Sequence, residues 1–499
     1  MNVNNQIKYG ALLSYLVIFI NIVIGLVYTP WMIKSIGKAD YGLFTLAMSI
    51  ISIFIFDFGL SSAVTRFVAK YLAEDNPSMV AKILGLVYKL YIGIDVIILL
   101  FLSLVYFLIP SIYGGLTHEE IEKFKIVFAI AATFSVVSFP FIPLNGVISA
   151  HEKFIQLKLC DLAHKLITVG LMSLCLFQGY GLYALVIVNA ISGVVTIILK
   201  LFIIWKNTDV KIEWRFYDSI ILKSILFFSA WVTVVSLCQR VIFNLAPSIL
   251  GIVSDSFNIA ILGVAATLEG YVYTFAAAIN GLFLPKVSRM VKKDDDNAIN
   301  SLMIRVGRIQ IFVISMIVFG FIAVGNDFIH IWVGSEYSEV YRCAILLMIP
   351  SLLYLPMEVG NTTVIAKNEV KSQARVFLIM AFINVTLAFP LSKQIGVTGM
   401  CISILVAYLW RSIGMNIVFS RKLSLDIFGF YRESFLKMSP ALVFMLGVSL
   451  LMHFWHLFPN NFMGVLLQSV LFVSIYLTVF WVFALNRSEK SLLLSPFKK

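Results

Sequence analysis

The sequence predicts an all-α, polytopic membrane protein with about fourteen transmembrane helices. Of its 499 residues, 60% are hydrophobic and only 13% are charged, which leaves too little polar surface to cover a soluble globule of that size. Apolar stretches of roughly 20 residues recur from end to end. These stretches are apolar on every face, whereas barrel strands alternate over about ten residues, so we expect helices and no strands.

The expected spans follow one another with short polar gaps, none long enough for a separate soluble domain. The first stretch is too long for a signal peptide and lacks a small-residue cleavage site, so we expect it to be retained. The spans are predicted at residues 9–33, 41–64, 83–109, 126–150, 154–178, 181–205, 221–250, 256–284, 303–325, 342–365, 372–393, 396–420, 436–458 and 462–486.

The formal charge of +12 is distributed in alternate loops. About 28 Lys and Arg residues lie in one set of loops and about six in the other. By the positive-inside rule the first set is cytoplasmic, both termini are cytoplasmic, and membrane lipids with anionic headgroups are partners. The charge therefore reports topology, and we expect no nucleic acid as a partner. The basic set comprises Lys8, 66–82, Lys153, 200–223, 286–308, 367–375, 421–437 and the C-terminal tail.

The sequence contains no pattern typical of a metal, cofactor or catalytic site. Its five cysteines are scattered in or beside the spans without C-x-x-C spacing, so neither a disulfide framework nor a thiolate metal site is predicted. No H-E-x-x-H, G-x-S-x-G or phosphate-binding glycine loop occurs. We therefore expect no cofactor and no enzymatic activity.

A weak internal repeat relates the two halves of the chain at an offset of about 215 to 221 residues. KYGALLS resembles KSILFFS, and NGVISAHEKF resembles NTTVIAKNEV at the same place in the topology. Six spans separate equivalent points, so the copies share one orientation, with a site expected between the halves. We predict an N-terminal six-helix lobe at 1–205, a cytoplasmic linker at 206–220, a C-terminal six-helix lobe at 221–420, and two additional helices with a tail at 421–499.

Three charged residues, Asp95, Arg240 and Glu269, lie near the middle of their spans. A charge is costliest at that depth, so a functional role is the first hypothesis for each. Helical spacing places Arg240 on a polar stripe of the seventh helix, and Glu269 on one of the eighth. Since polar stripes are expensive against lipid, both should face inward. An Arg240–Glu269 pair that serves packing alone is the alternative.

The stripes supply further candidate binding residues. Asn244 lies on the same stripe as Arg240, and Tyr273 and Asn280 lie on the same stripe as Glu269. The first helix corresponds to the seventh in the repeat, and Asn21 belongs to its less polar stripe.

Asp57 ends an apolar run in the cytoplasmic third of its span, where a wet vestibule makes a charge less costly. On one unbroken helix it would share a face with Ser61 and lie opposite Arg66, nine residues on. We expect Asp57 to gate the vestibule, with a purely structural role as the alternative. Asp161 and Lys165, four residues apart, are expected to form a structural pair.

The segment GKADYGLFTLAMSIISIFIFDFGLSSAVTRFVAKYLAEDN (37–76) resembles the signature of bacterial oligosaccharide flippases. Their superfamily also contains the multidrug and toxin extruders and the lipid II flippases. The resemblance implies export of an undecaprenyl-pyrophosphate-linked oligosaccharide across the bacterial inner membrane for surface polysaccharide such as O-antigen. Many relatives carry an acidic residue beside a basic one in the seventh span, whereas this chain has Gln239 beside Arg240, so no coupling role is carried over to that position.

The sequence is therefore interpreted as a lipid-linked oligosaccharide flippase that works by alternating access. The polyprenyl-diphosphate glycan and membrane lipids are the expected partners, and polysaccharide assembly proteins are further candidates. The alternatives are a cation-coupled multidrug extruder of the same superfamily, a membrane glycosyltransferase or polymerase, and an assembly scaffold. The expected substrate-binding residues are Arg240, Asn244, Glu269, Tyr273, Asn280 and Asn21, and the expected gating or ion-coupling residues are Asp57 and Asp95.

Overall fold

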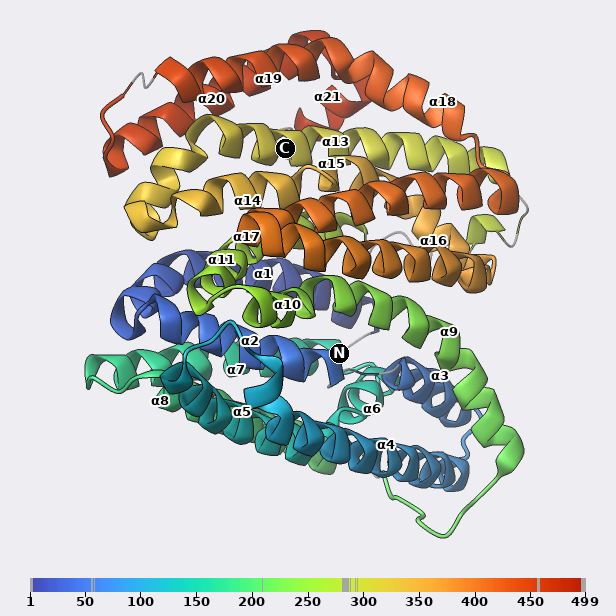
Figure 1. Cartoon of the computed structure of the whole chain (residues 1–499). Coiled ribbons are helices and arrows are strands. Elements are labelled where there is room, and N and C mark those ends of the chain that lie inside the picture. The colour runs from blue at the N-terminus through green and yellow to red at the C-terminus, as the bar shows by residue number, and fades with distance from the viewer. Residues whose placement is uncertain are drawn as a thin grey trace. The chain divides into compact units, whose positions relative to one another are not determined.

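The computed structural model describes residues 3–54, 57, 59–208, 210–280, 287, 289–291, 293, 295–455 and 458–494. Over these ranges the regular structure is helical throughout, with no strand, which confirms the predicted all-α polytopic class (Figure 1). The chain divides into two compact units, Met1–Ala260 and Ile261–Lys499, and each is described by itself. The lobe boundaries derived from the repeat stay a prediction.

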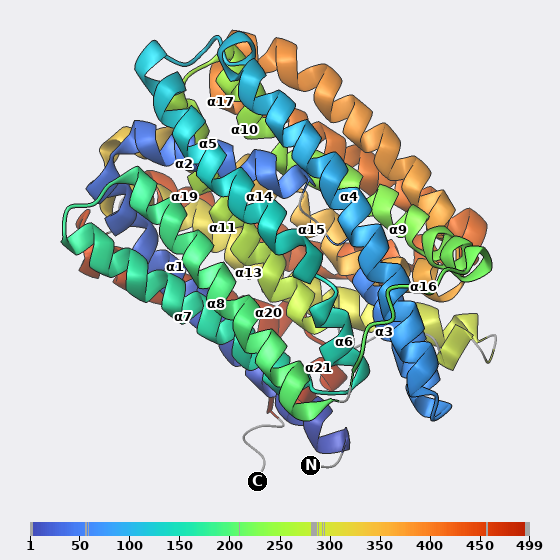
Figure 2. The ribbon, with the colours of Figure 1, turned by 90° about the horizontal axis from the view of Figure 1, so that it is seen from below.

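The first unit is a layered helical bundle. Its helix α7 packs against α1 and α8, α5 packs against α2, α4 and α8, and α9 packs against α2 and α3. Figure 2 shows α4 beside α5 and α7 beside α8. The helices are α1 (Val3–Ile36), α2 (Lys38–Phe54), α3 (Leu60–Ala73), α4 (Pro77–Ile112), α5 (His118–Ser138), η1 (Phe139–Phe141), α6 (Leu144–Ala150), α7 (Phe154–Phe177), α8 (Leu182–Asn207), α9 (Ser219–Asn244), α10 (Ala246–Val253) and the start of α11 (Ser256–Asn280).

The second unit is built around α13, which packs against α14, α16, α19 and α20. Besides the rest of α11, it contains α13 (Asp296–Trp332), η2 (Ser335–Tyr337), α14 (Ser338–Met348), α15 (Ser351–Tyr354), η3 (Leu355–Met357), α16 (Glu358–Ala366), α17 (Val370–Leu423), α18 (Ile427–Tyr431), η4 (Arg432–Leu436), α19 (Lys437–Trp455), α20 (Phe462–Phe483) and α21 (Arg487–Leu494).

Twelve helical stretches of the described residues are long and apolar enough to cross a membrane. They account for all but one of the expected spans, because α17 contains two, joined where Gly396 adopts a φ of 59°. The exception is 41–64, which is divided between α2 and α3. Gly59 precedes α3 with a φ of 68°, a left-handed conformation that glycine adopts without steric cost. The expectation of one unbroken helix from Asp57 to Arg66 is therefore wrong.

Alternate loops of the first unit meet at opposite ends. At the basic end the Glu213 N–H donates to the Ala81 carbonyl at 3.0 Å, which joins the linker after α8 to the start of α4. At the other end Lys123 Nζ lies 3.6 Å from Asp40 Oδ1, which joins α5 to α2. This arrangement agrees with the alternation of charge along the sequence. Which end is cytoplasmic stays a prediction.

The basic segments of the second unit also meet at one end. Lys367 Nζ donates to Asp296 Oδ1 at 2.8 Å and to the Leu423 carbonyl at 3.2 Å.

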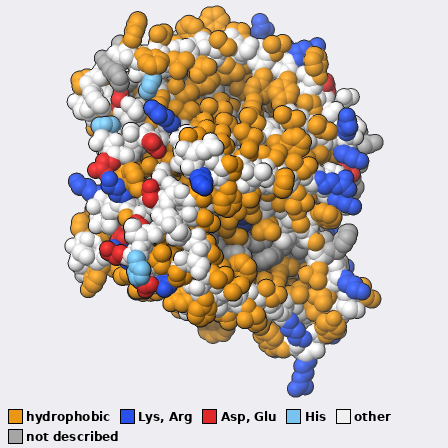
Figure 3. Space-filling view, viewed as in Figure 1, with side chains coloured by type: hydrophobic (Ala, Val, Ile, Leu, Met, Phe, Trp, Pro, Cys, Tyr) orange, Lys and Arg blue, Asp and Glu red, His pale blue; other side chains and the backbone are white. Residues whose placement is uncertain are grey.

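On the face shown in Figure 3, hydrophobic side chains cover the middle of the helices, and Lys and Arg gather where helices end. Phe107 on α4, for example, is 77% exposed. Exposed apolar surface of this kind is stable against lipid and costly against water.

Candidate functional site

The α2–α3 joint, which we define as Asp57 and Gly59, is the first candidate site. Asp57 Oδ1 accepts the Ser61 N–H at 2.8 Å, and the Asp57 carbonyl accepts the Leu60 N–H at 2.9 Å. The first N–H groups of a helix have no partner within the helix, so Asp57 stabilises the start of α3. The same Oδ1 accepts the hydroxyl of Tyr91, on α4, at 2.9 Å.

Arg240 reaches the same region from α9. Its Nη1 donates to the carbonyl of Ser52, in the last turn of α2, at 2.9 Å. Carbonyls at a helix C-terminus lack partners within the helix and favour a positive charge. The charge of Asp57 also acts on Arg240. The structure thus brings Arg240, which the sequence assigned to a separate role, to the end of α2 and within electrostatic range of Asp57.

Asp95, Asn21 and Asn244 lie elsewhere in the first unit. Asp95 is midway along α4, and within the described part of the chain its buried Oδ1 has no hydrogen-bond partner. Asn21 is half-buried on α1, and Asn244 is the last residue of α9. The span expected at 221–250 is divided at that point, because Pro247 lies in the first turn of α10.

A second candidate site is a buried cluster in the second unit, around Glu269 and Arg411. These side chains are only 6% and 5% exposed. The Arg411 guanidinium lies 4.2 Å from the ring centroid of Tyr354 and 4.9 Å from that of Phe377. Tyr354 and Glu269 act electrostatically on each other. Cation–π contacts of this kind stabilise a guanidinium that is buried away from water.

Glu358 adds a second carboxylate to this cluster. Its Oε2 accepts the amide of Asn361 at 2.8 Å, and Arg411 acts electrostatically on both Glu358 and Glu269. Tyr273, one turn beyond Glu269 on α11, lies within electrostatic range of the same three charges. Two carboxylates therefore lie within electrostatic range of one guanidinium, and together the three groups carry one net negative charge when both carboxylates are ionised.

Some of the predicted residue pairs differ in the structure, and others stay predictions. Asp161 lies 3.4 Å from Lys158, so the expected pair with Lys165 is wrong, because the side chain turns toward the residue three positions back. The Arg240–Glu269 pair would join the two units and stays a prediction. Asn280 is the last residue of α11, and its side chain lies outside the described part of the structure.

Tyr91, Tyr354 and Phe377 were missed because buried aromatic residues on apolar helices resemble ordinary core. Arg411 and Glu358 are charges within the expected spans, but no spacing in the sequence links them to Glu269. The three lie on α17, α16 and α11, and only the packing of these helices brings them together. A search for aromatic residues beside each intramembrane charge would have suggested Tyr408, whose ring centroid lies 5.5 Å from the Arg411 guanidinium.

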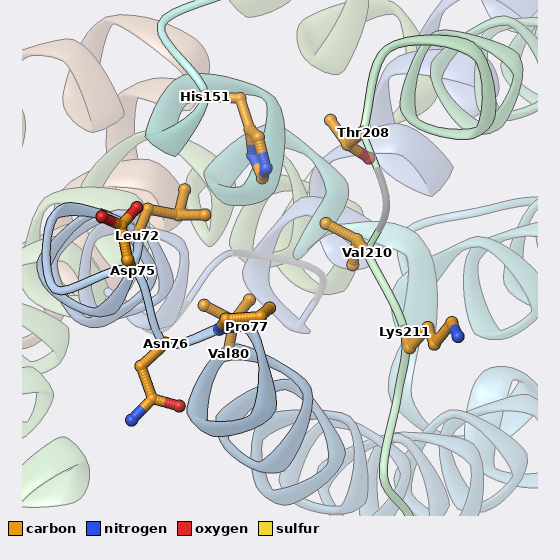
Figure 4. Close-up of a pocket in the computed structure, with 9 residues that line it drawn as sticks. All are labelled: Leu72, Asp75, Asn76, Pro77, Val80, His151, Thr208, Val210 and Lys211. Carbon is orange, nitrogen blue, oxygen red and sulfur yellow. The ribbon is translucent and has the colours of Figure 1, made fainter.

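A pocket of about 530 Å³ opens at the basic end of the first unit (Figure 4). It lies where the α3–α4 turn, the end of α6 and the linker after α8 meet, and His151 points into it. His151 Nδ1 contacts the Val147 carbonyl at 2.9 Å. Among the described residues, no group of three His, Cys, Asp or Glu side chains is arranged to hold a metal ion.

The fold resembles those of solved transporters. The lipid II flippase MurJ in an inward closed conformation has a TM-score of 0.66 at 17% identity, over 100% of this chain and 99% of that one. An inward-facing multidrug resistance MATE family transporter of the MOP superfamily has a TM-score of 0.65 at 14% identity, over 85% and 98%. A eukaryotic MATE transporter, AtDTX14, has a TM-score of 0.62 at 16% identity, over 87% and 98%.

Among curated proteins no significant sequence match is found. Residues 7–291 match the family described as polysaccharide biosynthesis protein, and this range is more than half of the chain. The structural similarities show the fold of flippases and transporters of the MOP superfamily. The chain is a multi-pass membrane protein with that fold, and it belongs to the polysaccharide biosynthesis protein family.

Proposed function

We propose that the protein flips an undecaprenyl-pyrophosphate-linked oligosaccharide from the cytoplasmic to the outer leaflet of the bacterial inner membrane. Membership of the polysaccharide biosynthesis family carries this proposal. The similarity to a lipid II flippase along the whole chain supports it, because lipid II is also a lipid-linked glycan. The basic loops are cytoplasmic in this proposal, as are both termini. Polysaccharide assembly proteins are further proposed partners.

The proposed substrate has three parts, and each requires a different kind of binding surface. Its diphosphate is bound by Arg240, because a planar guanidinium donates to two phosphate oxygens at once. Its sugars contact polar and aromatic side chains, for which Asn244, Asn21, Asn280 and Tyr273 are the candidates. Its prenyl tail stays in lipid, since burying it inside the protein would gain nothing over hydrocarbon.

The residues around Glu269 are also candidates for coupling transport to the movement of a proton or a cation. Because Arg411 acts electrostatically on both Glu269 and Glu358, a proton or a cation that neutralises one carboxylate would bring the net charge of the three groups to zero. Asp95, with an unpartnered carboxylate oxygen in the described structure, is the second coupling candidate. Binding and release of the neutralising ion would then change the charge inside the second unit during each cycle.

The test is binding and flipping of a fluorescent polyprenyl-diphosphate glycan by the purified protein in proteoliposomes. Arg240→Ala should weaken binding by about ten- to a hundredfold, because a charged hydrogen bond contributes roughly 1.5 to 3 kcal/mol. Arg240→Lys should recover only part, because an ammonium lacks the planar fork. Wild-type binding and flipping by correctly inserted Arg240→Ala would contradict the site.

A cation-coupled multidrug extruder is the second candidate, favoured by the similarity to multidrug resistance MATE transporters. It predicts transport of lipophilic cations and resistance to them on expression. The two candidates are separated by offering the same proteoliposomes a lipophilic cation and the glycan lipid. Transport of the cation alone would favour the extruder.

A further inference from the structure

The carboxylate of Asp57 is held in one position from two directions. Tyr91 is completely buried on α4, and its hydroxyl donates to Asp57 Oδ1 at 2.9 Å. The Ser61 N–H donates to the same oxygen at 2.8 Å. A carboxylate has about four lone-pair sites, so it can still accept further donors. Asp57 is therefore both fixed in place and able to accept a charged partner.

Arg240 contacts the last turn of α2, just before the joint. Its Nη1 donates to the Ser52 carbonyl at 2.9 Å, five residues before Asp57, and the Asp57 charge acts on it. The bond from the guanidinium to the Ser52 carbonyl has one ionised partner, and an anionic acceptor adds the attraction of a full opposite charge. A guanidinium that leaves the neutral Ser52 carbonyl for a carboxylate or a diphosphate therefore gains a stronger partner.

We propose that Asp57 is the internal anion that competes with the substrate diphosphate for Arg240, and that Tyr91 is the positioning residue that holds Asp57 ready for this exchange. The proposal rests on the proposed function and assigns the release step of that same site. While substrate is bound, its diphosphate pairs with the Arg240 guanidinium. Asp57 then takes the guanidinium as the diphosphate leaves. Without a competing anion at the joint, the carrier would bind substrate well but release it slowly.

The first test compares Tyr91→Phe with Tyr88→Phe. Tyr91→Phe keeps the buried ring and removes only the hydroxyl that contacts Asp57. Tyr88→Phe makes the same change one turn earlier on α4, at a ring that packs on Trp214 with 6.1 Å between centroids. In proteoliposomes, Tyr91→Phe should bind the fluorescent glycan lipid as tightly as wild type or tighter and lower the maximal flipping rate by about tenfold. Tyr88→Phe should change neither quantity.

The second test removes the competing charge. Asp57→Asn should bind the glycan lipid several-fold more tightly and flip it more slowly, and Asp57→Glu should restore part of the rate. Because Tyr91 acts through Asp57, the double variant Tyr91→Phe/Asp57→Asn should be no slower than Asp57→Asn alone. Additive losses of rate, or weaker binding by Asp57→Asn, would overturn the proposal.

Binding of inorganic pyrophosphate separates this proposal from the proposed function. Titration calorimetry on the detergent-solubilised protein should show tighter binding by Asp57→Asn than by wild type. If the glycan lipid is not flipped but this tightening occurs, the proposed substrate is wrong and the anion competition holds. If the lipid is flipped and pyrophosphate binds equally well to both proteins, the competition is refuted.

Discussion

At the scale of single residues, Arg411 illustrates how a membrane protein keeps a charge in its interior. Three aromatic rings lie near the guanidinium, with their centroids 4.2, 4.9 and 5.5 Å away, and two carboxylates lie within its electrostatic range. Each group alone would be costly at that depth. Removing one member of a buried charge cluster leaves its partners without compensation, which costs more than the pairing itself contributes.

We therefore predict that Arg411→Gln lowers the free energy of unfolding by about 3 to 5 kcal/mol. The loss leaves Glu269 and Glu358 buried without the positive charge of Arg411. A second substitution, Glu269→Gln, should recover part of it by removing one of these charges. Unfolding by denaturing detergent, followed by tryptophan fluorescence, measures the difference. Equal stability of Arg411→Gln and wild type would mean that the cluster is solvated.

At the scale of elements, a buried ion pair fastens the C-terminal helix α21 to α13. Arg308 Nε donates to Glu489 Oε1 at 2.5 Å, and Nη2 donates to Oε2 at 3.0 Å. Arg308 also donates to the carbonyls of Glu433 at 2.8 Å and Ala484 at 2.6 Å. Asn486 and Glu489 cap the start of α21 reciprocally, each accepting the other's N–H. One arginine thus joins α13 to the elements that follow α17.

We predict that Glu489→Gln releases α21 from this position and lowers the free energy of unfolding by about 3 to 5 kcal/mol, because Arg308 then stays buried without its carboxylate. Limited proteolysis should cut the C-terminal segment faster than in wild type. Glu433→Gln is the matched control, since its carboxylate pairs with the exposed Lys437 and such surface pairs contribute about 0 to 1 kcal/mol. Similar effects of the two variants would contradict the buried pair's role.

At the scale of the whole molecule, the positive-inside rule predicts the orientation. Each compact unit offers its own test. In a background without the five native cysteines, Glu119→Cys and Ser335→Cys should react with an impermeant thiol reagent added outside intact cells, whereas Lys211→Cys and Lys293→Cys should not. All four positions are exposed, so reactivity reports the side of the membrane. The reverse pattern would overturn both the orientation and the direction of transport.

The sequence by itself determined the fold class, because the free energy of burying apolar side chains in lipid depends on composition and run length, which are local properties. It also identified the charges within the spans, since each one is unusual where it stands. The sequence did not reveal the helix breaks around Asp57 and after Asn244, because apolar runs continue across both. A break also requires hydrogen-bond partners for the backbone groups that it frees, and these partners come from other parts of the fold.

Tertiary structure decided the partners of those charges. Arg240 donates to the Ser52 carbonyl at the end of α2, about 190 residues earlier in the chain, and the charge of Asp57 acts on it. Arg411 acts electrostatically on carboxylates of α11 and α16 that no spacing rule connects. The reason is physical: helical periodicity fixes which side chains share a face of one helix, whereas the contacts between faces follow from how helices pack and where they bend.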